Sequence, residues 1–181
     1  MPTIPRSGLT DAILRTIENL QKQRGEQPPL RLIGSLFTTF TFECEAFERW
    51  ILPSLYGIEQ ANSRPARLHM LRVQLQETAV PIVFYDVHTA PDMGTQAERF
   101  YYVPVQLEQG RLQHSKHTIL LLGDEDRSDV EYMILVTGSA NLTKAGWYRN
   151  IEFIDIEVLK MGQAISPSLK DGLSFINAQI G

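Results

Sequence analysis

The sequence predicts an α/β domain in which a mixed β-sheet is flanked by helices on both faces. Segments with helical apolar spacing alternate with β-branched and aromatic segments early in the chain, and short apolar segments follow one another closely later. The length of 181 residues, with 43% hydrophobic and 21% charged residues, is ordinary for a soluble globular protein. We therefore expect one domain over residues 1–181.

The helices are predicted from apolar residues that recur every three or four positions. The first helix is expected around Leu9, Ile13, Leu14, Ile17 and Leu20, with Ser7 or Thr10 as its N-cap and the Gly25–Pro29 segment as its end. A second begins near Glu43 and is disturbed at Pro53, and a third covers residues 66–77. A last amphipathic helix follows Pro167, through Leu169, Leu173, Ile176 and Ile180.

The strands are predicted from short runs of β-branched and aromatic residues between turn-forming segments. The expected strands cover residues 30–42, 81–85, 99–107, 113–122, 132–137 and 151–159. A polar loop over residues 88–97 and a short turn or helix over residues 142–147 connect them. Strands separated by helices early and lying close together late indicate a mixed sheet.

The single cysteine indicates a reducing compartment, whereas the charge balance indicates no particular binding partner. Seventeen Lys and Arg residues against 21 Asp and Glu residues give a net charge of −4, which does not indicate nucleic-acid binding. Cys44 is the only cysteine, so no intrachain disulfide can form, and we expect a buried thiol in a reducing compartment. The N-terminus lacks an apolar signal core and no segment has the length of a membrane span, so we expect a cytoplasmic protein.

The segment from His114 to Glu152 carries the residue types of a phosphate-handling site. It contains His114-Ser-Lys116, and later Gly138-Ser139-Ala-Asn141. Because successive side chains of a strand face opposite ways, His114 and Lys116 should share a face, as should Ser139 and Asn141 if the strand continues that far. A histidine nucleophile or base, a cation and an amide donor together can surround a tetrahedral anion.

These residues resemble the half-site motif of the phospholipase D superfamily. From Gly138, the family's Gly-Ser-x-Asn-(x)8-Asn-x-Glu spacing reaches Asn141, Asn150 and Glu152. The family's usual Asp, five residues after the lysine, is replaced by Leu121, and the nearest carboxylates are Asp124 and Asp126. In this respect the chain looks more like the tyrosyl-DNA phosphodiesterase branch. The resemblance implies a phospholipase D-like half-unit.

The same resemblance implies roles for the site residues. His114, Lys116, Asn141 and Glu152 would be catalytic, with Glu152 binding the second nitrogen of His114. Ser139 and Asn150 would contact or support the substrate. The alternatives are ordinary: a solvated lysine or glutamate on a strand, an asparagine that caps the segment at Leu142, a serine or asparagine in a turn.

Other residues near the motif are assigned to structure. Gly138 is expected to serve backbone geometry, and His117 to point away from Lys116 and pack. A metal site formed by His114, His117 and Asp124 is rejected, because histidines three residues apart on a strand face opposite ways. We expect neither a metal nor another cofactor.

The function that the sequence predicts is a metal-independent phosphodiesterase, more specifically a nuclease that acts through a phosphohistidine. Only one copy of the motif occurs, so a homodimer is expected to complete the site, with an interface that includes the 138–148 segment and a neighbouring apolar helix. The alternatives are a phospholipase D-type lipid hydrolase or phosphatidyltransferase, and a catalytically silent nucleic-acid-binding module of a larger defence or repair assembly. The sequence does not distinguish DNA from RNA, or endonuclease from exonuclease action.

Overall fold

The computed structural model describes residues 8–58, 63–89, 101–124 and 129–163, together with Pro167, Lys170, Asp171 and Ser174. Three predicted features fall wholly or largely outside these residues: the Ser7 cap, the loop over residues 88–97 and the C-terminal helix around residues 169–180.

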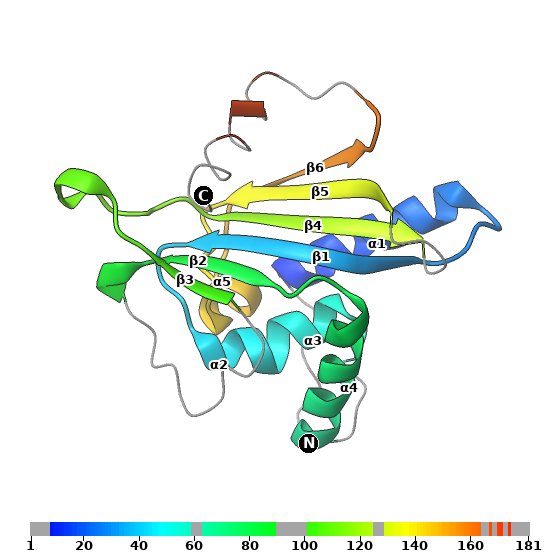
Figure 1. Cartoon of the computed structure of the whole chain (residues 1–181), viewed down its shortest axis with the longest axis horizontal. Coiled ribbons are helices and arrows are strands. Elements are labelled where there is room, and N and C mark those ends of the chain that lie inside the picture. Colours follow the sequence, from blue (N-terminus) through cyan, green and yellow to red (C-terminus); the bar gives the residue numbers. More distant parts are fainter. Residues whose placement is uncertain are drawn as a thin grey trace.

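A six-stranded mixed sheet forms the centre of the fold, in the order β3-β2-β1-β4-β5-β6. Its strands are β1 (Leu30–Thr39), β2 (Ile82–Asp86), β3 (Tyr101–Val105), β4 (His117–Asp124), β5 (Val130–Gly138) and β6 (Ile154–Lys160). Strands β1, β2 and β3 are parallel, whereas β4, β5 and β6 join the sheet in antiparallel pairs (Figure 1). The predicted α/β class with a mixed sheet is thus confirmed.

The helices lie between and beside these strands in the order that the sequence predicts. They are α1 (Leu9–Arg24), α2 (Cys44–Ala46), the π-helical turn η1 (Phe47–Ile51), α3 (Leu52–Leu55), α4 (Arg64–Glu77), the 3₁₀ turns η2 (Val87–Thr89) and η3 (Glu108–Gly110), and α5 (Lys144–Tyr148). Gly8, not Thr10, is the N-cap of α1, and Thr10 is buried inside its first turn. Pro53 follows directly after the π-helical turn, as expected of a residue that cannot donate a helical hydrogen bond.

The main core lies between one face of the sheet and the helices α1, α2–α3, α4 and α5. Fully buried members include Ile13 of α1, Phe47 of η1, Leu71 of α4 and Trp147 of α5, packed with Phe37 of β1. In Figure 1, α1 passes behind the strands, as this arrangement requires. Each helix therefore buries the apolar stripe that the sequence contains.

The opposite face carries a smaller apolar cluster. Ile119 and Met133 are buried there, with Leu36, Leu121, Leu135 and Leu159 partly buried around them. The described helices pack on the other face, and the C-terminal helix predicted after Pro167 lies outside the described residues.

Cys44 is buried, as expected, at the start of α2. Its thiol donates to Glu48 Oε1 at 3.3 Å, and Tyr102 Oη donates to the same oxygen at 2.6 Å. Burial raises the pKa of the thiol to about 12, so the nucleophilic thiolate is suppressed and the cysteine has a packing role.

Candidate active site

One end of the sheet brings together the ends of all six strands. Strands β1, β2, β3 and β5 end there, whereas β4 and β6 begin there, at the left of Figure 1. The register shows the alignment, because Thr38 pairs with His117, which pairs with Thr137, which in turn pairs with Asp155. The His114–Lys116 segment and the Gly138–Asn141 segment both lie at this end of the sheet. Residues more than twenty positions apart in the sequence are thereby brought together.

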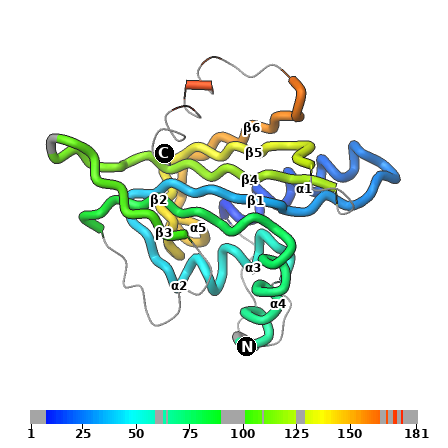
Figure 2. The backbone as a smooth tube through the Cα atoms, in the orientation of Figure 1, coloured from blue at the N-terminus to red at the C-terminus, as the bar shows by residue number. Residues whose placement is uncertain are grey.

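His114 and Lys116 lie just before β4, which begins at His117 and not at residue 113 as predicted. The chain enters β4 from the loop at the left of Figure 2. Lys116 Nζ lies 3.0 Å from His114 Nδ1 and donates to His114 O at 2.8 Å. The expectation that the two side chains share a face is therefore confirmed. The backbone N–H of Gly138 donates to Lys116 O at 3.2 Å, which joins this segment to the end of β5.

Phe40 forms a wall for this pair, and the sequence argument missed it. The Phe40 and His114 rings lie 4.9 Å apart between centroids, tilted by 36°. Lys116 Nζ lies 5.9 Å from the centre of the same ring, within the range of a cation–π contact. The strand predicted over residues 30–42 ends at Thr39, so Phe40 follows it, and nothing local in the sequence relates Phe40 to His114.

The protonation of the pair follows from hydrogen-bond chemistry. An ammonium group can only donate, so Lys116 can bind His114 Nδ1 only while that nitrogen carries no proton. Burial lowers the pKa of Lys116, and the negative charge of Glu152 opposes this shift. His114 itself is exposed and can be reached by a substrate.

Asn141 lies beyond the end of β5 at Gly138, so it does not extend the strand face of Ser139. Its Oδ1 accepts from Thr41 N at 3.1 Å and lies 3.4 Å from Thr39 Oγ1. The N–H of Leu142 is instead bound by Thr39 Oγ1, at 2.9 Å, so Asn141 is not the cap of Leu142. These contacts fix the orientation of the amide, and its Nδ2 makes no hydrogen bond to the described part of the chain.

Glu152 binds partners other than the one expected. Its Oε2 accepts from the hydroxyl of Ser139, and its Oε1 accepts from Asn150 Nδ2 at 3.2 Å. The predicted bond from His114 to Glu152 is therefore not made; His114 Nδ1 faces Lys116 instead. The carboxylate acts on Lys116 through charge, as the pKa of that lysine shows. Ser139, Asn150 and Glu152 form one hydrogen-bonded group at the start of β6.

Gly138 serves backbone geometry, as predicted. A Cβ atom at this position would collide with the carbonyl oxygen of Phe153 and with Ile154. The backbones meet closely because Ser139 N donates to Phe153 O at 3.0 Å. Only glycine allows the two chain segments that carry Ser139 and Glu152 to approach this far.

His117 belongs to the opposite side of the segment, as predicted. It is half-buried, burial lowers its pKa, and its buried Nδ1 has no hydrogen-bond partner in the described part of the structure. A neutral, packed imidazole satisfies these observations.

Leu121 stands where the family that the motif resembles usually carries an Asp, and no described carboxylate takes its place. Leu121 packs with Ile119 and Met133 on the face opposite the main core. Asp124 lies at the far end of β4 and faces Arg24, with its Oδ2 3.7 Å from the Arg24 Nη2 atom. Asp126 lies outside the described residues.

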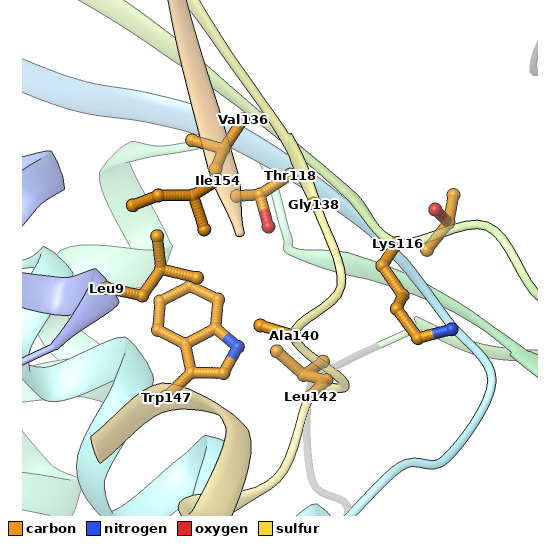
Figure 3. A pocket seen from close by; sticks show the side chains of 10 residues that line it. Leu9, Lys116, Thr118, Val136, Gly138, Ala140, Leu142, Trp147 and Ile154 are labelled. Carbon is orange, nitrogen blue, oxygen red and sulfur yellow. The ribbon is translucent and has the colours of Figure 1, made fainter. Parts of the chain in front are cut away.

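Beneath the site, a small cavity of about 10 Å³ separates the sheet from α1 and α5. It has room for about one water molecule. Its walls combine apolar side chains with polar groups, with Lys116 at one side and Trp147 on the other (Figure 3). A cavity of this size cannot hold a phosphodiester, and the exposed His114 lies outside it.

Within the described residues, no three His, Cys, Asp or Glu side chains gather as a metal site. No helix among them is both long enough and apolar enough to cross a membrane.

No protein-family model matches the chain, and no curated protein does. Among solved structures, the chain is similar to NucT from Helicobacter pylori, with 11% sequence identity and a TM-score of 0.45. The similarity covers 94% of this chain and 87% of that chain. A likeness this remote says nothing of activity or substrate.

Proposed function

We propose that the protein is a metal-independent phosphodiesterase of the phospholipase D type, and that its substrate is a nucleic acid. The main support for this proposal is the exposed His114 beside Lys116. The Gly138–Asn141 and Asn150–Glu152 parts of the motif lie at the same end of the sheet. The family resemblance supplies the reaction class, and the geometry supports it.

The reaction proceeds in two displacements. A phosphodiester binds beside His114 at this end of the sheet. Lys116 then moves from His114 to a non-bridging oxygen of the phosphate, because that group carries a full negative charge. A ring nitrogen of His114 then forms a bond to phosphorus while the bond to the leaving oxygen breaks. An acid protonates that oxygen, and water later cleaves the phosphohistidine. Lys116 and the amide group of Asn141 stabilise the negative charge of the transition state.

The bonds of Glu152 set a condition on this mechanism. Because its carboxylate accepts from Ser139 and Asn150, it cannot orient His114 until those bonds rearrange. In the ground state its charge instead favours the protonated form of Lys116. If Glu152 never leaves Ser139 and Asn150, the protein would be a catalytically silent nucleic-acid-binding module. The Leu121 that replaces the family's usual Asp also favours this alternative.

A homodimer would supply the acid as the partner's copy of the same histidine. Within the predicted 138–148 interface segment, Leu142, Trp147 and Tyr148 are buried in the protein's own core, whereas Gly138 and Ser139 are exposed. Exposed apolar side chains also flank Glu152: Ile151 and Phe153 are 101% and 88% exposed. Burying them against a second copy would place two motifs face to face.

A nucleic-acid substrate is preferred to a lipid. At Leu121 the motif resembles the DNA-repair branch of the superfamily more than its lipases. The alternative is a phospholipase D-type lipid hydrolase or phosphatidyltransferase.

The test is cleavage of single-stranded DNA, duplex DNA, RNA and phospholipid vesicles by the wild type and by His114→Ala. The matched control is His69→Ala, which removes an exposed histidine of α4. We expect nucleic-acid cleavage that survives a chelator and falls by about 10²–10⁴-fold or more in His114→Ala only. Activity retained by that variant contradicts the mechanism, and release of phosphatidate with nucleic acids intact supports the lipid alternative.

Subunit mixing tests the dimer. Heterodimers of wild-type and His114→Ala subunits hold one competent histidine and should turn over slowly. A demonstrated monomer with full activity at nanomolar concentration contradicts the shared site.

A further inference from the structure

The segment that carries His114 and Lys116 is held from its opposite side. Gln113 Nε2 donates to Ser115 Oγ, and Ser115 Oγ donates to Thr38 Oγ1 at 3.3 Å. Because alternate side chains of an extended segment point in opposite directions, these bonds leave the face of His114 and Lys116 free.

The same hydroxyl of Thr38 also accepts from the backbone N–H of His117 at 2.9 Å. Thr38 is buried at the end of β1, so it links the segment to the core of the sheet. Side-chain bonds therefore replace the strand ladder that begins only at His117.

Asp86 anchors the start of this arrangement. It is only 1% exposed, at the end of β2. Its Oδ2 accepts from the backbone N–H of Gln113 at 2.6 Å, and its Oδ1 accepts from that of His88 at 2.8 Å. A buried carboxylate requires such donors, and charge-assisted bonds of this kind are short and strong.

The turn that follows Asp86 also holds the aromatic wall of the site. The hydroxyl of Thr89 donates to the carbonyl oxygen of Phe40. The same Oγ1 atom lies 3.1 Å from the backbone carbonyl oxygen of Asp86. The ring of Phe40 packs on His114. One turn therefore restrains both the backbone before His114 and the ring against which His114 lies.

We propose that Asp86 is a positioning residue for the His114–Lys116 pair, acting through the N–H of Gln113 and the hydroxyls of Ser115 and Thr38. This inference rests on the proposed function. Asparagine cannot replace Asp86 without loss, because its amide has one oxygen for two backbone donors and turns an N–H group toward one of them.

The experiment compares Asp86→Asn with Asp129→Asn, which alters an exposed aspartate at the other end of the sheet. We expect kcat to fall by about 10- to 100-fold in Asp86→Asn with a much smaller change in KM, because misplaced reacting groups slow the chemical step. The amide hydrogens of Gln113 and His88 should exchange faster, while those in the middle of β4 keep their protection. A kcat equal to that of Asp129→Asn overturns the proposal.

Ser115→Ala provides a second variant, since it removes one bond of the relay and leaves the buried carboxylate of Asp86 in place. We expect a smaller loss of kcat and faster exchange at Gln113, so unchanged values of both overturn the relay if Asp86→Asn does not fold. If the wild type cleaves no phosphodiester, the proposed function fails. The exchange of the Gln113 amide in these variants still decides whether Asp86 holds the segment.

Discussion

The two ends of the β4–β5 pair both have charged side chains nearby, but those at one end are buried and paired, whereas those at the other end are accessible. At one end, Arg24 Nη2 lies 2.8 Å from Glu131 and 3.7 Å from Asp124, and the arginine side chain is 3% exposed. At the other end, His114 is exposed and Lys116 rests against it and Phe40. A buried ion pair is held in one arrangement by the penalty for separating it. Lys116 donates to the backbone oxygen of His114 and faces its ring, so the ammonium group can move to an incoming anion, and this is the end at which we propose that chemistry occurs.

Asp124 is too far from His117 to take the place of the Asp that the phospholipase D superfamily usually carries after its lysine. The strand is eight residues long, and Asp124 and His117 are at its opposite ends. With a rise of about 3.3 Å per residue, these ends are roughly 23 Å apart. A nearby position in the sequence therefore corresponds to a remote position in space.

Arg24→Ala should produce the largest effect, at the paired end. Removing one partner of a buried ion pair leaves the other charge uncompensated, and we expect the free energy of unfolding to fall by about 3 kcal/mol. Urea denaturation measures this change. The control Arg15→Ala breaks an exposed pair with Asp11, in which the arginine side chain is 74% exposed, and should cost only about 0.3–0.5 kcal/mol. Equal effects of the two variants would contradict the contrast between the ends.

Lys116→Arg sharpens the contrast at the exposed end through pH. Because burial lowers the pKa of Lys116, the wild type should lose its cation, and with it activity, at a pH below the usual lysine value of 10.5. Arginine stays charged throughout, so the variant should lack this alkaline fall, although its different geometry lowers the maximum rate. The pH dependence of kcat/KM for both proteins tests this. If kcat/KM falls at the same alkaline pH in the wild type and in Lys116→Arg, a group other than Lys116 causes the fall.

His117 should give the smallest effect, on stability. Burial lowers its pKa below 6.5, so between these two values the unfolded chain binds a proton that the native protein does not. The free energy of unfolding should therefore decrease as the pH falls below 6.5, until the folded protein is protonated too. Urea denaturation at pH 7.5 and pH 5.5 measures it, and His117→Gln should show a weaker pH dependence. An unchanged dependence in that variant would attribute the effect to other groups.

The sequence by itself determined what depends on local backbone and composition. Apolar periodicity located the helices and strands, because burying one face requires that spacing whatever the partner. Alternation also placed His114 and Lys116 on one face, although β4 begins three residues later than the first of them. Gly138 was expected to serve backbone geometry, and the close approach of Phe153 confirms it.

Only the tertiary structure decided which remote groups hold the site. Asp86, Thr38 and Phe40 are separated from His114 by whole helices and strands, and no local pattern relates them. The expected partner of His114 was wrong for the same reason. Whether Glu152 reaches a ring nitrogen or the hydroxyl of Ser139 depends on how two chain segments cross, and packing of the whole sheet sets that crossing.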